Sequence, residues 1–494
     1  MNHRTGAASI ITAEQIDSEV GLLNRLKSRV TGSAEHEELI GHIESQLRES
    51  GLAVNSDSLF FSSWTSVAGE AASLRVEGRL HRISSIVPYS GTTSPAGIEA
   101  ELVLLGSLMP TWENARDKIA VVEVSNFRVP MRGPIGTWGD DPSWPTTANP
   151  VIAATIAGTR LAQARRAGVK AVIFAWKNIS DECADDQYLP FTFDYQDIPA
   201  VFVSGAAGRS VVEAAAAGET GSLVVPYVVT PGATTRTLSA VVEGTHAPDE
   251  TVLMVTHTDG VNAIEENGHI ALVAMARAAA RNPPERTSVF VFTSGHLRIP
   301  AFTSHGQATQ RFLTDHPELW AGGPGQRHAV AGLAVEHLGA VEFSDDPVNN
   351  LQRPTGLLEP ELLYATTPQL ADLARENWEF APGSIRRISK PSPLIHFGEG
   401  EPLLHAGIPA VSLVTAPLYL LAQRKGDEVE LVDKEALHRQ VDSFERLYRR
   451  LTSLQTTDFG RTRKPGPMRM IAGVLILASA TAARAVARLF DRRL

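Results

Sequence analysis

The segment Val255-Thr-His-Thr-Asp-Gly-Val-Asn-Ala-Ile-Glu-Glu-Asn-Gly268 joins an apolar run to a helical pattern through a loop rich in metal-binding residue types. Residues 252–255 are all apolar, which is typical of a strand covered on both faces. An open α/β sheet places its chemistry at the carboxyl ends of such strands. At this end, His257 can hold a metal ion with the carboxylate of Asp259 behind it.

Strand-like runs alternate with helical periodicity on either side of this segment. The expected strands are 252–255, 289–292, 333–335 and 410–414, and the expected helices are 270–280, 427–453 and two within 13–54. Apolar strands that alternate with helices predict an α/β fold: a mostly parallel twisted sheet with helices on both faces.

A second domain is expected in the first half of the chain, because 494 residues exceed what one core usually serves. This half contains short expected strands at 100–105, 119–124, 171–176 and 200–203, a helix at 153–167, and irregular stretches at 126–149 and 178–196. Irregular stretches of that length are usually functional or disordered. Their aromatic residues, such as Trp138 and Tyr188, either contact a substrate or pack between domains.

Composition limits the partners and the compartment. A net charge of -10 argues against nucleic acid binding, which needs dense Lys and Arg. Cys183 is the only cysteine, which excludes an intramolecular disulfide and a cysteine-rich zinc site. Glu14 and Asp17 precede any apolar run that a signal peptide needs, so we expect a cytoplasmic protein. A homodimer is left open.

The C-terminal residues 456–494 are expected to form a basic linker and an amphipathic helix. The apolar run 470–483 has arginines on both sides and is shorter than the ~20 residues that span a bilayer. Two interpretations stay open for this helix. It either packs on the protein or a partner, or makes weak contact with a membrane surface.

Three motifs follow one another in order. They are His257-Thr258-Asp259, then Asn262-Ala-Ile-Glu265-Glu266-Asn267 before a helix, then Ser294-Gly295-His296 after a strand. In this order the chain resembles the co-catalytic zinc aminopeptidases, a family that includes glutamate carboxypeptidase II and the transferrin receptor. The resemblance implies a divalent metal cofactor, zinc above all, with one or two ions.

The resemblance extends over most of the chain. It implies an aminopeptidase-like α/β domain of residues 13–87 and 233–455, which is interrupted by a β-rich protease-associated (PA) domain at 88–232. The PA-like features are Tyr89-Ser-Gly91, Lys118-Ile-Ala-Val-Val122 and Ile198-Pro-Ala200. The segment Ala406-Gly-Ile-Pro-Ala-Val411 resembles the last strand of the family's main domain.

The site residues depart from the family pattern. In the family's terms, His257 binds one metal ion above Asp259, and Glu265 replaces the aspartate that bridges two ions. Gly295 replaces the general base, and His296 replaces the glutamate ligand that follows it.

Two further ligand positions can be matched. Glu336, followed by His337, falls on the next carboxylate ligand, and Gly400 replaces the family's final histidine. The metal site is therefore degenerate in sequence.

The resemblance thus implies a set of candidate site residues. The metal ligands are His257, Glu265, His296 and Glu336; Asp259 and His337 lie behind them; and the candidate general bases are Glu266, Glu399 and Glu401. Without a metal ion, the same residues would be a buried His–carboxylate pair, glutamates at a helix N-terminus, and solvated glutamates.

Three functions are weighed. The retained ligands favour a metal-dependent hydrolase of amide or related acyl bonds, acting on a peptide or small amide, with a rebuilt metal site and base. The lost base and final histidine favour the alternative of an inactive relative that binds a ligand or a protein. A glutaminyl cyclase-like enzyme is the third function, because related cyclases share the fold.

Overall fold

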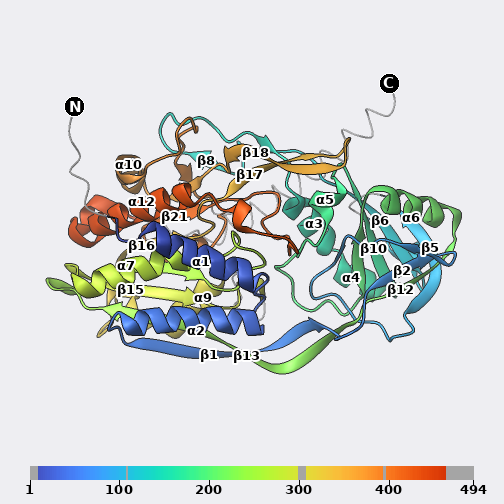
Figure 1. Ribbon diagram of the computed structural model, residues 1–494, viewed down its shortest axis with the longest axis horizontal. Helices are drawn as coiled ribbons and strands as arrows, with labels where there is room; N and C mark the ends of the chain where they lie inside the picture. Colours follow the sequence, from blue (N-terminus) through green and yellow to red (C-terminus); the bar gives the residue numbers. More distant parts are fainter. Residues whose placement is uncertain (1–8, 107–109, 299–306, 393–395, 463–494) are drawn as a thin grey trace.

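The computed structural model describes residues 9–106, 110–298, 307–392 and 396–462, which form two units that are each built around a sheet (Figure 1). The larger unit contains a nine-stranded sheet in the order β1-β13-β15-β14-β16-β21-β19-β20-β8. Its strands are Val54–Ser66 (β1), Gly136–Thr137 (β8), Tyr227–Val242 (β13), Ala247–His257 (β14), Arg286–Thr293 (β15), His328–Val335 (β16), Leu362–Ala365 (β19), Ser389–Lys390 (β20) and Ala410–Val414 (β21). Its helices are Ala13–Leu26 (α1), Ala34–Glu49 (α2), His269–Arg281 (α7), Ala308–Asp315 (α9), Pro368–Asn377 (α10), Gly400–Ala406 (α11) and Lys434–Ser453 (α12).

This sheet is mixed, which corrects the expectation of a mostly parallel sheet. The central strands β15, β14, β16 and β21 are mutually parallel. Toward the edges, β1 pairs with β13, β13 with β15, β19 with β21, and β20 with β8 in antiparallel fashion. The sequence signal came from the central strands, because only these are apolar on both faces, whereas β1 has many exposed residues.

Helices cover both faces of the central strands. Val252 and Met254 pack into the core beneath α1, α2, α7, α10 and α12, whereas Leu253 and Val255 pack with α9 and α11. This division follows from the alternation of side chains along a strand. All four residues are fully buried, as the apolar run predicted.

The smaller unit has an eight-stranded sheet in the order β3-β2-β12-β5-β6-β10-β11-β4. Its strands are Ser73–Val76 (β2), Arg79–His81 (β3), Ser85–Ile86 (β4), Ile98–Leu105 (β5), Ile119–Ser125 (β6), Ala171–Lys177 (β10), Ala200–Val203 (β11) and Thr220–Val224 (β12); its helices are Pro150–Gly158 (α3), Leu161–Ala167 (α4), Asp181–Ala184 (α5) and Gly205–Ala217 (α6). The predicted helix at 153–167 is thus two helices. The strands β2 to β4 precede residue 88, so this sheet starts earlier than the expected insertion.

The smaller unit lies between β1 and β13 in the sequence. These two strands form a long antiparallel ribbon, which runs from the larger unit toward the smaller one along the bottom of Figure 1. One face of the smaller sheet packs with α3 and α4 into a core that also contains Val261, Leu297 and Leu421 of the larger unit. The loops that follow β14 and β15 are therefore covered by the smaller unit.

Residues 126–149 do not behave as part of the smaller sheet. Within them, β8 adds an edge strand to the larger sheet through β20. Nε1 of Trp138 donates a hydrogen bond to the carbonyl of Ala365, and Nε1 of Trp144 donates to the hydroxyl of Ser389. Both indoles therefore fasten this segment to the larger unit.

Two shorter strand pairs complete the fold. They are the hairpin of Val341–Asp346 (β17) with Leu351–Leu358 (β18), and the pair of Val129–Pro130 (β7) with Thr146–Thr147 (β9). Across the described residues, no helix combines the length and apolarity needed to cross a lipid bilayer. The amphipathic helix predicted around 470–483 lies outside the described residues.

Candidate metal centre

The carboxyl ends of the central parallel strands bring the candidate residues together. His257 is the last residue of β14, His296 follows β15, and Glu336 and His337 follow β16. Because parallel strands end at the same edge of a sheet, these four side chains meet there. All are at least 95% buried.

Two histidines present an Nε2 atom with no hydrogen-bond partner among the described residues. Nδ1 of His257 donates to the carbonyl of Asp259, and Nδ1 of His337 donates to the carbonyl of Thr415, each over 2.8 Å. Neither buried Nε2 has a partner in the described chain. A backbone carbonyl that fixes the Nδ1 proton leaves the Nε2 lone pair free for a metal ion, which is the usual state of a histidine ligand.

Glu266 is the carboxylate closest to His257. Its Oε1 accepts hydrogen bonds from Thr256 Oγ1 at 2.9 Å and from the Gly268 amide at 2.5 Å. Its Oε2 lies 2.9 Å from Nε2 of His257, yet neither atom is aligned for a hydrogen bond. Two unsatisfied buried atoms that face each other in this way are the arrangement expected of two ligands that share a metal ion.

Glu265 and Glu336 complete the cluster. One carboxylate oxygen of Glu265 and one ring nitrogen from each of His257 and His337 lie within 4.8 Å of one another. Glu336 Oε2 lies 3.7 Å from His257 Nε2 and 4.0 Å from His337 Nε2, while its Oε1 accepts from the Glu399 amide. The cluster therefore offers imidazole and carboxylate groups to one position.

The charges in this cluster are strongly coupled. Burial disfavours the imidazolium of His257, but the carboxylates of Glu266 and Glu336 outweigh burial and raise the His257 pKa well above its ordinary value. Burial raises the pKa of Glu265 to about 7, although His257 and His296 act against this shift. Burial also acts to raise the pKa of Glu336, but His257 and His337 hold it at about 2.

A buried arginine supplies fixed positive charge beneath the cluster. Arg29 is fully buried and donates from Nη2 to the carbonyls of Asn262 and Glu266 at 2.8 and 3.3 Å. Burial lowers its pKa, and the carboxylates of Glu265 and Glu428 act against that shift. This role of Arg29 could not be predicted, because nothing in a sequence shows that an arginine is buried.

His296 is held differently from the other two histidines. Its ring stacks on that of His257 with centroids 3.8 Å apart, and its Nδ1 donates to Oε1 of Glu399 at 2.9 Å. Burial and the charge of His257 lower the pKa of His296, but Glu399 outweighs them and raises it. Nδ1 is therefore committed to Glu399, which leaves only Nε2 for a metal ion.

The structure changes two of the expected supporting roles. The carboxylate of Asp259 does not support His257; it accepts hydrogen bonds from Thr31, from the His296 amide and from the Leu297 amide. The backbone carbonyl of Asp259 takes the expected role instead, because the chain turns at that residue. His337 was expected behind the ligands, but its Nε2 lies in the cluster.

The two aromatic candidates, Trp138 and Tyr188, lie in different surroundings. Trp138 is bonded to the larger unit beside β19, and Lys390 lies over its ring, so it lies away from the cluster and a substrate role is not supported. Tyr188 is buried at the contact between the two units, and the nearby Phe191 stacks on His296 with centroids 5.3 Å apart. The loop of residues 188–191 thus forms a wall of the centre.

The remaining candidate bases lie on or before α11. Both oxygens of Glu399 are used by His296 and by the first amides of α9. Burial raises the pKa of Glu401 to about 7, with Gln307 acting against that shift. Glu399 is thus a supporting group, and no contact with the cluster is recorded for Glu401 in the described part of the chain.

Sequence reasoning overlooked His396, which lies in the same glycine-rich loop as Glu399. It is buried, its Nε2 lies 3.3 Å from Ser412 Oγ, and its ring packs on Tyr364 at 4.4 Å. Burial lowers its pKa to about 3, against the charge of Glu336. Its position four residues before Gly400 was the available signal.

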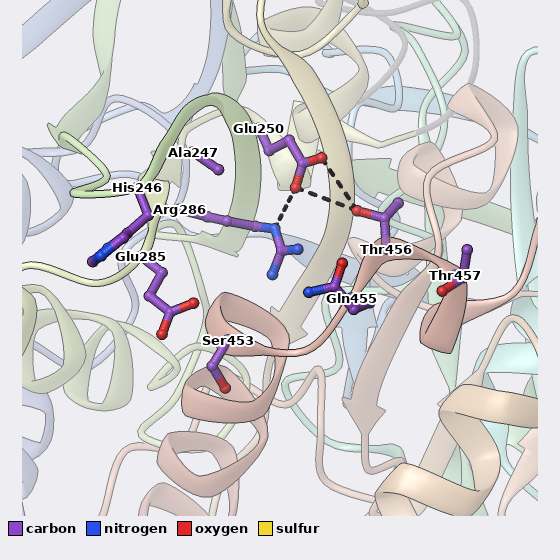
Figure 2. A pocket seen from close by; sticks show the side chains of 9 residues that line it. All are labelled: His246, Ala247, Glu250, Glu285, Arg286, Ser453, Gln455, Thr456 and Thr457. Atoms are coloured by element: carbon purple, nitrogen blue, oxygen red, sulfur yellow. Dashed lines mark hydrogen bonds and ion pairs between the residues drawn. The ribbon is translucent and has the colours of Figure 1, made fainter.

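A pocket of 420 Å³ lies at the opposite edge of the sheet, near the start of β15 (Figure 2). Figure 2 shows the carboxylate of Glu250 turned toward Arg286 and Thr456. Arg286 donates to Glu250 at 2.5 Å and to the Leu451 carbonyl, so its charge is already satisfied. This pocket contains none of the candidate ligands.

Comparison with solved structures agrees with the architecture. The chain is similar to an aminopeptidase from Aneurinibacillus sp. strain AM-1, with 16% identity, a TM-score of 0.61, and coverage of 89% of this chain and 94% of that chain. It is similar to a zinc aminopeptidase from Bacillus subtilis, with 15% identity, a TM-score of 0.61, and coverage of 92% and 98%. It is also similar to a peptidase M28 precursor from Shewanella amazonensis, with 16% identity, a TM-score of 0.62, and coverage of 90% and 94%.

The chain therefore has a zinc aminopeptidase-like α/β fold. At 15–16% identity, this likeness shows the fold alone. No protein-family model and no curated protein matches the sequence.

Proposed function

We propose that this protein is a metal-dependent hydrolase of amide bonds in peptides or related acyl compounds, with a single metal ion. One observation carries the proposal: Nε2 of His257, Nε2 of His337 and Oε2 of Glu266 are three buried atoms without hydrogen-bond partners in the described chain, and an oxygen of Glu265 lies within 4.8 Å of both histidines. Unpartnered buried polar atoms are costly, so a bound cation is the simplest group that satisfies all three. Two imidazoles and a carboxylate are ligands that suit zinc.

The fold's neighbours support the reaction class. The solved structures that share the architecture include a protein described as a zinc aminopeptidase. When bound, a zinc ion would polarise the substrate carbonyl. The protein's own residues must then hold the ion, accept a proton from water and exclude bulk solvent.

Glu266 and Glu265 divide the remaining work in this proposal. Glu266 has one oxygen fixed by Thr256 and Gly268 and the other directed at His257, as a ligand requires. Glu265 lies in the same cluster and accepts a hydrogen bond from the Val261 amide through Oε2. This assignment reverses the expectation from the sequence, in which Glu265 was a ligand and Glu266 a candidate base: Glu265 is here the proton acceptor that replaces the base lost at Gly295.

We infer a single ion because the second metal position of the resembling family lacks ligands in this chain. Gly400 has no side chain to offer, and both oxygens of Glu399 are engaged with His296 and with the first amides of α9. His296 then serves to hold the ring of His257 from one side.

Metal analysis tests the proposal. Elemental mass spectrometry of the purified protein, after incubation with Zn²⁺ and dialysis, should find about one equivalent per chain. His257→Ala and His337→Ala should each lose the ion, whereas His246→Ala, at an exposed histidine, should keep it. Wild-type protein that retains no metal would overturn the proposal.

Hydrolysis is measured in parallel with a panel of aminoacyl amides and dipeptides. Turnover that is removed by chelation and restored by Zn²⁺ is the expected result. Full metal occupancy without turnover of any amide would instead favour the inactive, ligand-binding relative. Conversion of N-terminal glutamine peptides to a cyclised product would favour the cyclase.

A further inference from the structure

Arg298 lies beside the candidate metal centre, and the described residues offer it no ion-pair partner. It closes the 3-10 turn His296–Arg298, two residues after the histidine that stacks on His257. Its side chain is only 6% exposed, and its Nε and Nη1 atoms have no hydrogen-bond partner among the described residues. A buried arginine is normally paired, so this one is incomplete.

The surroundings of Arg298 are aromatic rather than acidic. Its Cζ atom lies 4.2 Å from the centre of the Tyr89 ring, and Tyr89 packs edge-on against Tyr188 at 5.9 Å. Both tyrosines come from the smaller unit and are buried. The rings stabilise one face of the guanidinium, but they supply no negative charge to its N–H groups.

The carboxylate of Asp259, which bonds to the backbone beside Arg298, is engaged elsewhere. Both oxygens of Asp259 accept hydrogen bonds, from Thr31 and from the amides of His296 and Leu297. The next eight residues of the chain, 299–306, contain no Asp or Glu in their sequence. Within the described ranges, no carboxylate pairs with this buried cation, an arrangement that is costly unless an external anion completes it.

We propose that Arg298 binds a carboxylate of the substrate, so that the protein selects amides with an acidic group next to the scissile bond. The proposal rests on the hydrolase function proposed above. Arginine pairs with carboxylates through charge-assisted hydrogen bonds, which are the strongest that a neutral-pH site offers. The loop that carries Tyr188 also places Phe191 on His296, so one wall borders both Arg298 and the metal centre.

A pocket adjoins this wall at Tyr188. Tyr188 lines this pocket of 610 Å³ between the units, together with Trp64, whose ring meets Tyr89 edge-on at 5.8 Å.

Equilibrium binding tests the site without need of turnover. Calorimetry on the full chain, incubated with Zn²⁺, compares N-acetylglutamate with N-acetylglutamine, which differ in charge and little in shape. The wild type should bind the acid at least about tenfold more tightly, the scale of a charged hydrogen bond. Arg298→Gln should reduce this ratio to near one, and Arg298→Lys should retain part of it, because lysine keeps the charge without the planar fork.

Arg387→Gln is the matched control. Arg387 is 8% exposed and lies over Trp144 at 5.0 Å, but its Nε donates to the Pro142 carbonyl, away from the metal centre. This variant should bind both ligands like the wild type. A wild-type ratio near one, or a ratio that Arg298→Gln and Arg298→Lys both leave unchanged, would overturn the proposal.

Two further measurements distinguish a carboxylate from a phosphate at Arg298, and the anion site from the proposed hydrolase function. Inorganic phosphate should compete weakly with N-acetylglutamate; tighter binding of phosphate would overturn the carboxylate assignment. The ratio of kcat/KM for Ala-Glu over Ala-Gln should fall in Arg298→Gln while metal content stays the same. Arg298-dependent binding of N-acetylglutamate without hydrolysis of any amide would retain the anion site and reject the hydrolase.

Discussion

Oε1 of Glu399 accepts a hydrogen bond from Nδ1 of His296 at 2.9 Å, and the same carboxylate accepts from the first two amides of α9. One buried side chain thereby joins a residue of the metal centre to the N-terminus of α9. A negative charge is favourable at a helix N-terminus, and it also favours the protonated form of His296.

Glu399→Gln should therefore lower stability without removing the metal ion. The amide keeps one acceptor oxygen but loses the charge shared by His296, Ala308 and Thr309, so we expect a loss of about 1–3 kcal/mol in the free energy of unfolding. Urea unfolding followed by circular dichroism measures it. Glu401→Gln is the control, because burial raises the Glu401 pKa to about 7 and removal of its charge should not destabilise the protein at pH 8. Equal stability of Glu399→Gln and wild type would contradict the prediction.

Glu265 and Glu266 should respond differently to the same substitution. Glu266→Gln should release the metal ion, because Oε2 of Glu266 is the carboxylate oxygen that faces His257. Glu265→Gln should retain the ion and lose about 10²–10⁴-fold in turnover, the usual contribution of a general base. Elemental analysis and hydrolysis rates on the same preparations separate the two effects. Loss of metal from Glu265→Gln alone would reverse the assignment.

The sequence was sufficient for the location of the site but not for its chemistry. His257 could be predicted at a strand end because the apolar run 252–255 is unmistakable, and that end of the sheet is where side chains converge. Which of two adjacent glutamates faces His257 depends on the turn at Gly268. That turn is set by contacts with Thr256 and with the end of β16, which a sequence does not show.

The position of the His337 side chain also could not be predicted from the sequence. A histidine next to a predicted carboxylate ligand was expected to lie behind it. Its backbone instead adopts a φ of 55°, a left-handed conformation that is uncommon outside glycine, and this brings Nε2 into the cluster. Strained conformations of this kind gather at functional sites and leave no signature in residue order.

A second buried cluster makes stability depend on pH. Glu19 of α1 bonds to His42 of α2 at 3.0 Å and to His269 of α7 at 3.2 Å. Burial acts to raise the Glu19 pKa, but hydrogen bonds from both histidines lower it well below its ordinary value. Glu19 raises the pKa of His42, against burial. The contribution of the Glu19 carboxylate to stability is thus present above the ordinary glutamate pKa and is lost as the pH falls below it. The contribution of His42 is complete below the ordinary histidine pKa and is lost as the pH rises through the raised pKa of His42.

Glu19→Gln should remove both the loss of stability at acid pH and the loss at alkaline pH. At pH 7 we expect a loss of about 1–3 kcal/mol in the free energy of unfolding, with less change between pH 3 and 5 than in the wild type. Urea titrations from pH 3 to 9 measure the profile. Glu213→Gln, at an exposed position of α6, should leave it unchanged. A wild-type profile without an acid limb would contradict the assignment.

Gly400 should resist even the smallest side chain. A Cβ atom at this position would lie 2.6 Å from Oγ of Ser412 and 2.7 Å from Cε1 of His396, so a neighbour must move. Gly400→Ala should cost about 1–3 kcal/mol, as overpacking of a close-packed site does. Ser412→Ala removes the closer atom, so the double variant should recover part of that loss, and a double-mutant cycle in urea unfolding gives the coupling.

Gly400→His, which places a histidine where the resembling family has its final ligand, should for the same reason fail to add a second equivalent of zinc. Neutral Gly400→Ala, or a Gly400→His variant that gains an equivalent, would show that the position has room for a side chain and would contradict this prediction.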